Sequence, residues 1–202
     1  MKSFADIGVS RQSIEKLAER GIKAPTEIQE KVIPLLSAGR DLAFRSATGT
    51  GKTFAYLLPI VQALTEREGH RGPPLALICA PTYELCAQIK GEVDFLLSAF
   101  EGRFKAALLT GDANLSRQID KLKSDKPIII VGNPGRILQL DRMAKLRLSS
   151  IRYLVMDEAD RLCADELIET TKELVSKLSE ERVSVACSAT LPKKPAKGLK
   201  LF

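Results

Sequence analysis

A glycine-bearing segment that ends in lysine and threonine is the part of this sequence with the clearest chemistry. Residues 46–53 read SATGTGKT, after an apolar stretch at 41–45 and before Phe54–Val61, whose composition indicates a helix. Glycines let backbone N–H groups surround phosphate oxygens, and the start of a helix favours the same negative charge. We therefore predict a phosphate-binding loop. Its backbone contacts would come from Thr48, Gly49, Thr50 and Gly51, with Lys52 reaching the outer phosphates and Thr53 binding Mg2+.

This loop departs from the usual pattern at one position. The first glycine of the G-x-x-x-x-G-K-[ST] pattern would fall at residue 46, which is Ser46. A turn rich in glycine and threonine, with a lysine beside it by chance, is the alternative interpretation of the segment.

An acidic cluster supplies the second half of a phosphoryl-transfer site. Asp157-Glu158-Ala159-Asp160 directly follows the apolar run Tyr153–Met156, which predicts a buried strand. A carboxylate at a strand end, Asp157, can hold Mg2+ directly or through water, and Glu158 beside it can act as the base for an attacking water. Lys52, Asp157 and Glu158 are thus the candidate catalytic residues. The alternative is an acidic cluster that only caps the next helix.

Strand-like and helix-like stretches alternate along the chain, which predicts an α/β fold with a mostly parallel sheet covered by helices on both faces. The expected strands are 41–45, 75–79, 105–109, 128–131, 153–156 and 183–186, and helical spacing recurs at 85–100, 115–122, 136–140 and 167–178. Two more helices should precede the first strand. One runs from the N-cap Ser10 to Gly21, and the other starts near Thr26 and kinks or breaks before Pro34.

Composition bounds the class of protein. A chain of 202 residues with 45% hydrophobic and 28% charged residues fits one soluble domain. The net charge of +6 favours a polyanionic partner, but fits a solvated basic surface equally well. Four cysteines without a C-x-x-C pair predict reduced thiols and a cytoplasmic protein, or a nuclear one in a eukaryote. No apolar run approaches the ~20 residues of a membrane span, so we expect no membrane partner.

Several ordered motifs resemble one family. Residues 157–160 spell DEAD, and Ser188-Ala189-Thr190 lies where DEAD-box RNA helicases carry their Ser-Ala-Thr motif. Residues 21–29, GIKAPTEIQ, are similar to that family's glutamine motif, and Phe4 stands 17 residues before Gly21, where the family places an isolated aromatic residue. The sequence thus resembles the N-terminal RecA-like P-loop domain of the DEAD-box ATP-dependent RNA helicases over essentially its whole length.

The resemblance implies roles that the residue types alone do not fix. Gln29 would read adenine, since its amide can accept from N6–H and donate to N7, and Phe4 would stack on the base. Asp160, Ser188 and Thr190 would couple the nucleotide state to RNA through hydrogen bonds between the two motifs. The alternatives are a surface glutamine, an aromatic residue that only packs beside the first helix, and a strand-end turn held by short hydroxyl bonds.

The motifs that would face RNA match less regularly. The family's Pro-Thr-Arg-Glu-Leu is Pro-Thr-Tyr-Glu-Leu at 81–85, its Gly-Gly is Gly-Asp at 111–112, and its Thr-Pro-Gly-Arg is Asn-Pro-Gly-Arg at 133–136. The tyrosine and the aspartate should weaken phosphate binding, which depends on cations and backbone N–H groups. RNA contacts implied by the resemblance remain at Pro81, Thr82, Gly111, Asn133, Gly135 and Arg136.

These observations predict a domain that binds Mg-ATP and couples its hydrolysis to RNA binding and local duplex unwinding. A second RecA-like domain, reached through a linker that starts at 192–202, would complete the enzyme. The 202-residue chain alone would be monomeric and without useful turnover. A nucleotide-regulated RNA-binding or scaffold protein with little turnover is the alternative. A DNA-directed helicase is a third reading, which the glutamine motif and the DEAD spelling disfavour.

Overall fold

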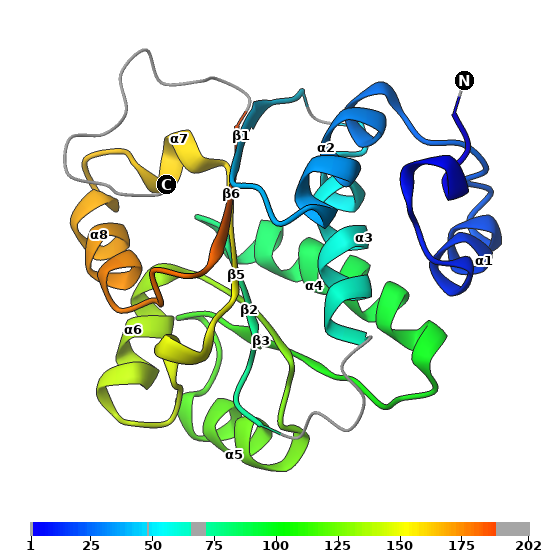
Figure 1. Ribbon diagram of the computed structural model, residues 1–202. Helices are drawn as coiled ribbons and strands as arrows, with labels where there is room; N and C mark the ends of the chain where they lie inside the picture. The colour runs from blue at the N-terminus through cyan, green and yellow to red at the C-terminus, as the bar shows by residue number, and fades with distance from the viewer. Residues whose placement is uncertain (1, 48, 66–71, 189–202) are drawn as a thin grey trace.

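The structure is a computed structural model that describes residues 2–47, 49–65 and 72–188, without the side chain of Thr65. Its centre is a parallel sheet of six strands in the order β1-β6-β5-β2-β4-β3 (Figure 1). The strands are β1 (Leu42–Arg45), β2 (Ala76–Cys79), β3 (Ala106–Leu109), β4 (Ile129–Gly132), β5 (Tyr153–Asp157) and β6 (Val183–Ser188). Each lies within a few residues of an expected strand, so the α/β prediction is confirmed.

Helices cover both faces of the sheet. They are η1 (Ala5–Ile7), α1 (Arg11–Glu19), α2 (Glu27–Ser37), α3 (Lys52–Thr65), α4 (Tyr83–Leu97), η2 (Ser98–Phe100), α5 (Leu115–Asp125), α6 (Pro134–Arg142), η3 (Leu148–Ser150), α7 (Ala159–Leu162) and α8 (Ile168–Ser176). Side chains of α1 to α4 share one hydrophobic cluster with the sheet, and those of α5 to α8 share the other. None of these helices is long and apolar enough to cross a bilayer.

The central strands separate the two clusters. All four residues of β2 are buried, because a parallel sheet between two helical layers has no solvated face. Successive side chains of a strand point to opposite faces. Ile78 therefore packs with the cluster under α1 to α4, and Leu77 packs with the cluster under α5 to α8.

The expected break before Pro34 is wrong, since α2 runs through Pro34 to Ser37. The ring of Pro34 is exposed, so the backbone hydrogen bond that it removes lies on the solvent side of the helix. Val32, Ile33 and Leu36 are buried, and α2 packs along α3. This packing holds the helix together, as tertiary contacts supply most helical stability in proteins.

Strand order decides which loops meet. All six strands are parallel, so the segments that follow them emerge at one edge of the sheet. The carboxyl ends of β1, β6 and β5 lie together, and those of β2, β4 and β3 lie together beside them. The first group contains the predicted nucleotide motifs, and the second contains the predicted RNA motifs.

Candidate functional site

The phosphate-loop segment connects β1 to α3, as predicted. Gly49 and Gly51 have φ of +80° and +86°, a region that side chains other than glycine rarely adopt. The Thr50 hydroxyl donates to the Ala47 carbonyl at 2.8 Å and shares a hydrogen bond with the Ser46 hydroxyl. Ser46, which replaces the usual glycine, is thus a bonded part of the loop, and its N–H donates to the Ser188 carbonyl of β6 at 3.1 Å. Thr48 lies outside the described residues.

Lys52 and Asp157 meet although 105 positions separate them in the sequence. Lys52 is the first residue of α3, Asp157 is the last of β5, and Nζ lies 2.9 Å from Oδ1. Both residues are buried, with 9% of Lys52 and none of Asp157 exposed. Burial by itself would lower the pKa of Lys52, but the hydrogen bond and charge of Asp157 outweigh it and raise this pKa. The lysine is therefore held as a cation beside the predicted metal ligand.

Two side chains that the sequence did not single out also bind this carboxylate. The Tyr56 hydroxyl donates to Asp157 Oδ2 at 2.9 Å, and the Cys187 thiol donates to Oδ1 at 3.3 Å. Burial, with the charge of Asp157 added, raises the pKa of Tyr56 and that of Cys187 well above their usual values, so both remain neutral donors. Tyr56 is four residues after Lys52, one helical turn away, which a helical reading of the segment could have found. Cys187 is opposite Asp157 only through the β5–β6 register.

Glu158 turns the chain sharply away from β5. Its backbone has φ 52° and ψ 50°, a left-handed conformation, and its N–H donates to Asp157 Oδ1 at 2.9 Å. Its carboxylate pairs with Arg161, one turn into α7, at 2.8 Å. The side chain is one-quarter exposed, so the proposed base lies at the surface of the site while Asp157 lies beneath it. Asp160 follows inside α7.

Gln29 joins the glutamine motif to the phosphate loop. Its Nε2 donates to the Gly51 carbonyl at 3.0 Å, and its Oε1 accepts from the Thr26 N–H at 3.0 Å, at the start of α2. A primary amide carries two N–H groups and two oxygen lone pairs, so each atom keeps capacity for one further bond. Gln29 is 2% exposed. The resemblance implied that Gln29 serves the nucleotide site but gave no contact with the loop, and its contact with adenine stays a prediction.

Some of the other residues predicted to serve the nucleotide site lie within the described part of the chain, and some lie outside it. Phe4 is 2% exposed within the cluster under α1 to α4, so stacking on a base would require its neighbours to uncover the ring. Thr53 follows Lys52 in α3 and is half-buried. Ser188 ends β6 and is buried, whereas Thr190 and the predicted linker at 192–202 lie outside the described residues. A cleft of about 480 Å³ separates the start of α2 from the loop, between Thr26 and Thr50.

The predicted RNA motifs lie at or just before the starts of three helices at the same edge of the sheet. Thr82 caps α4 by accepting from the Leu85 N–H at 3.3 Å, and Asn133 caps α6 by accepting from the Arg136 N–H at 3.4 Å. The change from threonine to Asn133 therefore retains the capping function, since both residue types serve as N-caps. Pro81 is half-buried, and Gly111 and Gly135 are exposed. Tyr83 is 44% exposed on the first turn of α4, so it is not packed away under a neighbouring helix.

Arg136 connects two of these motifs. Its guanidinium donates to the Gly111 carbonyl at 2.9 Å and to the Ala113 carbonyl at 3.0 Å, in the loop that follows β3. A guanidinium has five N–H donors, so others remain for a phosphate. The sequence placed Arg136 in this region but gave no signal for its contact with the neighbouring loop. Direct RNA contact by any of these residues stays a prediction.

The nucleotide half of the site fits a phosphate and a divalent cation. Two glycines in left-handed conformations and the start of a fourteen-residue helix present backbone N–H groups beside Lys52. Asp157 accepts hydrogen bonds from Lys52 and three neutral donors, and carboxylate oxygens are the ligands that Mg2+ prefers. Thr53 provides a hydroxyl at the start of the same helix.

Comparison with known proteins agrees with this geometry. The profile of the DEAD/DEAH box helicase family matches residues 26–198. DEAD-box ATP-dependent RNA helicase 47A of Oryza sativa is 37% identical over 95% of this chain, and RNA helicase CrhR of Synechocystis is 38% identical over 95%. The chain spans only 38% and 37% of those two relatives.

A solved structure extends the agreement to the fold. The crystal structure of a DEAD box protein from Methanococcus jannaschii superposes with a TM-score of 0.84 at 29% identity, covering 95% of this chain and 51% of that one. This likeness confirms the RecA-like fold expected from the sequence. With the phosphate loop at β1, the DEAD segment at β5 and the profile match together, the chain belongs to the DEAD/DEAH box helicase family.

Proposed function

We propose that this chain binds Mg-ATP and is the nucleotide-binding half of an ATP-dependent RNA helicase. The observation that carries the proposal is the 2.9 Å contact between Lys52 at the start of α3 and Asp157 at the end of β5. It brings together, from two motifs far apart in the sequence, the cation that we propose binds phosphate and the carboxylate that we propose binds Mg2+. The family supplies ATP as the expected nucleotide.

Each residue has a distinct part in the proposed reaction. The backbone of Gly49 to Gly51 and the ammonium of Lys52 would hold the phosphates, while Thr53 and Asp157 would hold Mg2+, which would neutralise charge on the phosphate oxygens. Lys52 would exchange its bond with Asp157 for a phosphate oxygen. Glu158 would orient and deprotonate the attacking water once released from Arg161. Gln29, with one N–H and one lone pair to spare, would select adenine.

RNA and a second domain are part of the proposal. The exposed edge formed by the starts of α4, α5 and α6 would bind the RNA backbone, through Thr82, Gly111, Asn133, Gly135 and Arg136 with Pro81 beside them. The two relatives named above are called RNA helicases and are more than twice as long as the matched segment. Asp160, Ser188 and Thr190 would couple this edge to the nucleotide. We also propose that the isolated chain is monomeric and that the protein is cytoplasmic, where its free cysteines stay reduced.

Calorimetry with this chain tests nucleotide binding. ADP with Mg2+ should bind more tightly than GDP, because a site built for one base edge rejects an analogue that leaves its polar groups unpaired. Gln29→Ala should reduce that preference by about 1–3 kcal/mol. Equal affinities for ADP and GDP would refute the adenine assignment.

Turnover tests the catalytic part of the proposal in the protein that also carries the second domain. Glu158→Gln keeps the size of the side chain and removes the base, so it should abolish RNA-stimulated ATP hydrolysis while ATP binding remains. Wild-type turnover by Glu158→Gln would remove Glu158 from the mechanism. Absence of RNA-stimulated hydrolysis in the unaltered protein would favour a nucleotide-regulated RNA-binding protein instead.

A further inference from the structure

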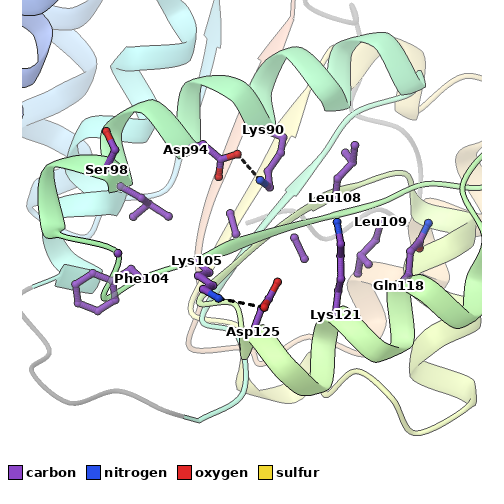
Figure 2. Close-up of a pocket in the computed structure, with 14 residues that line it drawn as sticks. Lys90, Asp94, Ser98, Phe104, Lys105, Leu108, Leu109, Gln118, Lys121 and Asp125 are labelled. Atoms are coloured by element: carbon purple, nitrogen blue, oxygen red, sulfur yellow. Dashed lines mark hydrogen bonds and ion pairs between the residues drawn. The ribbon is translucent and has the colours of Figure 1, made fainter.

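The outer edge of the sheet at β3 forms a groove that the nucleotide and RNA motifs do not use. β3 is the last strand in the order, so in the described part of the chain no strand pairs with its outer side. A groove of about 550 Å³ follows this edge, with α4 as one wall and α5 as the other. Figure 2 shows β3 passing between the two helices, with Lys90 and Asp94 on one side and Lys121 and Gln118 on the other.

The backbone of β3 presents free hydrogen-bonding groups to this groove. The carbonyls of Lys105 and Leu109 accept from β4-side N–H groups, at 2.9 Å from Ile128 and 3.2 Å from Asn133. The N–H and C=O groups of one strand residue point to the same side, and those of the next point to the other. The N–H and C=O groups of Ala106 and Leu108 therefore point outward. Such a row is a template for one more strand.

Charge decides which strand fits. Lys90 is paired with Asp94 at 2.5 Å and Lys105 with Asp125 at 3.1 Å, whereas the Lys121 ammonium has no ion pair or hydrogen bond within the described residues. A second copy of this chain would bring a second unpaired Lys121 to the edge, and the two like charges would repel. An acidic segment would instead pair with Lys121.

The end of the groove near the RNA motifs contains an unsatisfied acceptor. Gln118 is 5% exposed, its Nε2 donates to the Thr110 carbonyl at 2.9 Å, and its Oε1 has no hydrogen-bond partner among the described residues. A buried polar atom without a partner is costly, and such atoms are rare in native structures. A ligand N–H at this end would supply the missing donor after a small rotation of the amide.

The size and walls of the groove define the ligand further. The four residues of β3 span about 13 Å, which four residues of an added strand would match. A strand in this position turns alternate side chains toward α5, where Lys121 lies, and toward α4, where Leu97 lines the groove beside the neutralised Lys90–Asp94 pair, with Phe104 just before β3. We propose that the β3 edge binds a short extended peptide of a partner protein, in which acidic side chains facing α5 alternate with apolar ones facing α4.

A designed peptide tests the proposal directly. The probe is a fluorescein-labelled hexapeptide in which valine and glutamate alternate, with its ends blocked, titrated against the 202-residue chain by fluorescence anisotropy. Binding should be saturable below about 1 mM. Hydrogen exchange should show new protection at the Ala106 and Leu108 amides. A peptide in which lysine replaces glutamate should not bind.

Two variants and a matched control separate the parts of the interaction. Lys121→Glu should weaken binding about tenfold by placing like charges together. Lys123→Glu, an equal charge change at an exposed residue of α5 that does not line the groove, should leave affinity unchanged. Ala106→Pro removes one outward N–H, retains the bonds to β4, and should abolish binding, because proline is tolerated at a strand edge but cannot donate.

Several results would overturn the proposal. They are the absence of binding by the valine–glutamate peptide, equal losses in Lys121→Glu and Lys123→Glu, or protection confined to residues outside β3. Concentration-dependent dimerisation that Ala106→Pro abolishes, measured by sedimentation, would assign the edge to a second copy of the chain. Binding of single-stranded RNA that Lys121→Glu weakens, without any binding of the peptide, would assign the groove to RNA. If Ala106→Pro does not fold, the comparison of Lys121→Glu with Lys123→Glu still tests whether the peptide binds in this groove.

Discussion

Asp157 is a fully buried carboxylate whose charge is balanced by Lys52 alone among the described cations within ion-pair distance. Tyr56, Cys187 and the Glu158 N–H satisfy its remaining hydrogen-bonding capacity. Removing one partner from a buried ion pair leaves an uncompensated charge, which costs more than the pair itself contributes. The same two residues therefore serve stability when no nucleotide is bound and, in our proposal, chemistry when it is.

Lys52→Ala should lower the free energy of unfolding by about 2–4 kcal/mol without nucleotide, because Asp157 remains buried and charged. Adding Asp157→Asn removes that charge, so the double variant should be more stable than Lys52→Ala. Urea unfolding of both single variants and the double variant, followed by circular dichroism, gives the values. If the changes in the free energy of unfolding caused by the two single substitutions simply add, Lys52 and Asp157 do not interact in solution.

Gly51 connects the phosphate loop to the glutamine motif through its shape as well as its carbonyl. Its φ is +86°, and a Cβ at this position would lie 2.5 Å from Gln29 Nε2. Gly49 has a similar φ but nothing within 4 Å of such a Cβ. A substitution would therefore strain the backbone at either glycine, but of these two positions only Gly51 would also force Gln29 to move.

Gly51→Ala should destabilise the chain by about 2–3 kcal/mol, against about 1–2 kcal/mol for Gly49→Ala, which carries the strain alone. In a Gln29→Ala background the difference between the two should shrink, because the displaced side chain is gone. Thermal unfolding of the four variants measures this coupling. A difference that persists without Gln29 would contradict the steric explanation.

At the scale of elements, helix starts and strand spacing hold the site in place. Three of the loops at the carboxyl edge lead into helices capped by Thr82, Asn114 and Asn133. Gly132 at the end of β4 allows the backbone of β4 to lie close to that of β3. A Cβ there would lie 2.1 Å from the Leu109 carbonyl oxygen, a backbone atom that cannot move away without disturbing β3.

Gly132→Ala should cost at least about 3 kcal/mol or prevent folding, since overpacking here acts on two backbones. Gly91→Ala is the matched control. Gly91 is exposed within α4 with nothing within 4 Å of an added Cβ, so alanine there should stabilise the chain by about 0.5–1 kcal/mol. Chemical denaturation of both variants compares them. A mild effect at Gly132 would mean that β3 and β4 are spaced more widely in solution.

At the scale of the whole molecule, the strand order places the predicted nucleotide and RNA motifs on one edge of the sheet. β6 lies between β1 and β5, and β2 follows β5 toward β4 and β3. The proposed RNA edge carries exposed Tyr83 and exposed Asp112 at positions where the family usually has arginine and glycine. Both residues reduce the positive charge available to a phosphate backbone.

The double variant Tyr83→Arg with Asp112→Gly should tighten RNA binding of the full-length protein by about 1–2 kcal/mol and steepen its dependence on salt. Met143→Arg adds a cation at an exposed residue at the other end of α6, and it should change neither the RNA affinity nor its salt dependence. Titration of fluorescent single-stranded RNA at two salt concentrations measures both quantities. Equal behaviour of the two variants would place Tyr83 and Asp112 outside the RNA path.

The 202-residue chain alone should bind Mg-ATP but show no useful RNA-stimulated turnover. In related phosphoryl-transfer enzymes an arginine that stabilises the transferring group contributes about 10³–10⁵ in rate, and the resemblance places such arginines in the second domain. Phosphate release with and without RNA provides the measurement. Turnover by residues 1–202 comparable to the full-length protein would show that this chain is catalytically complete.

The sequence by itself determined the elements and the local chemistry. Apolar runs located all six strands, Ser10 located the start of the first helix, and the motifs at 46–53 and 157–160 predicted the two halves of a nucleotide site, because these signals depend on neighbours in the chain. The break at Pro34 was wrong because packing of α2 on α3 outweighs one lost hydrogen bond.

Only the tertiary structure decided which distant residues meet. Cys187 reaches Asp157 through strand register, Arg136 reaches Gly111 because β3 and β4 are neighbours, and Gln29 reaches Gly51 because α2 packs on α3. The free edge of β3 likewise follows from strand order alone. A single sequence does not encode these contacts locally, since each depends on how strands are ordered and helices are packed across the whole sheet.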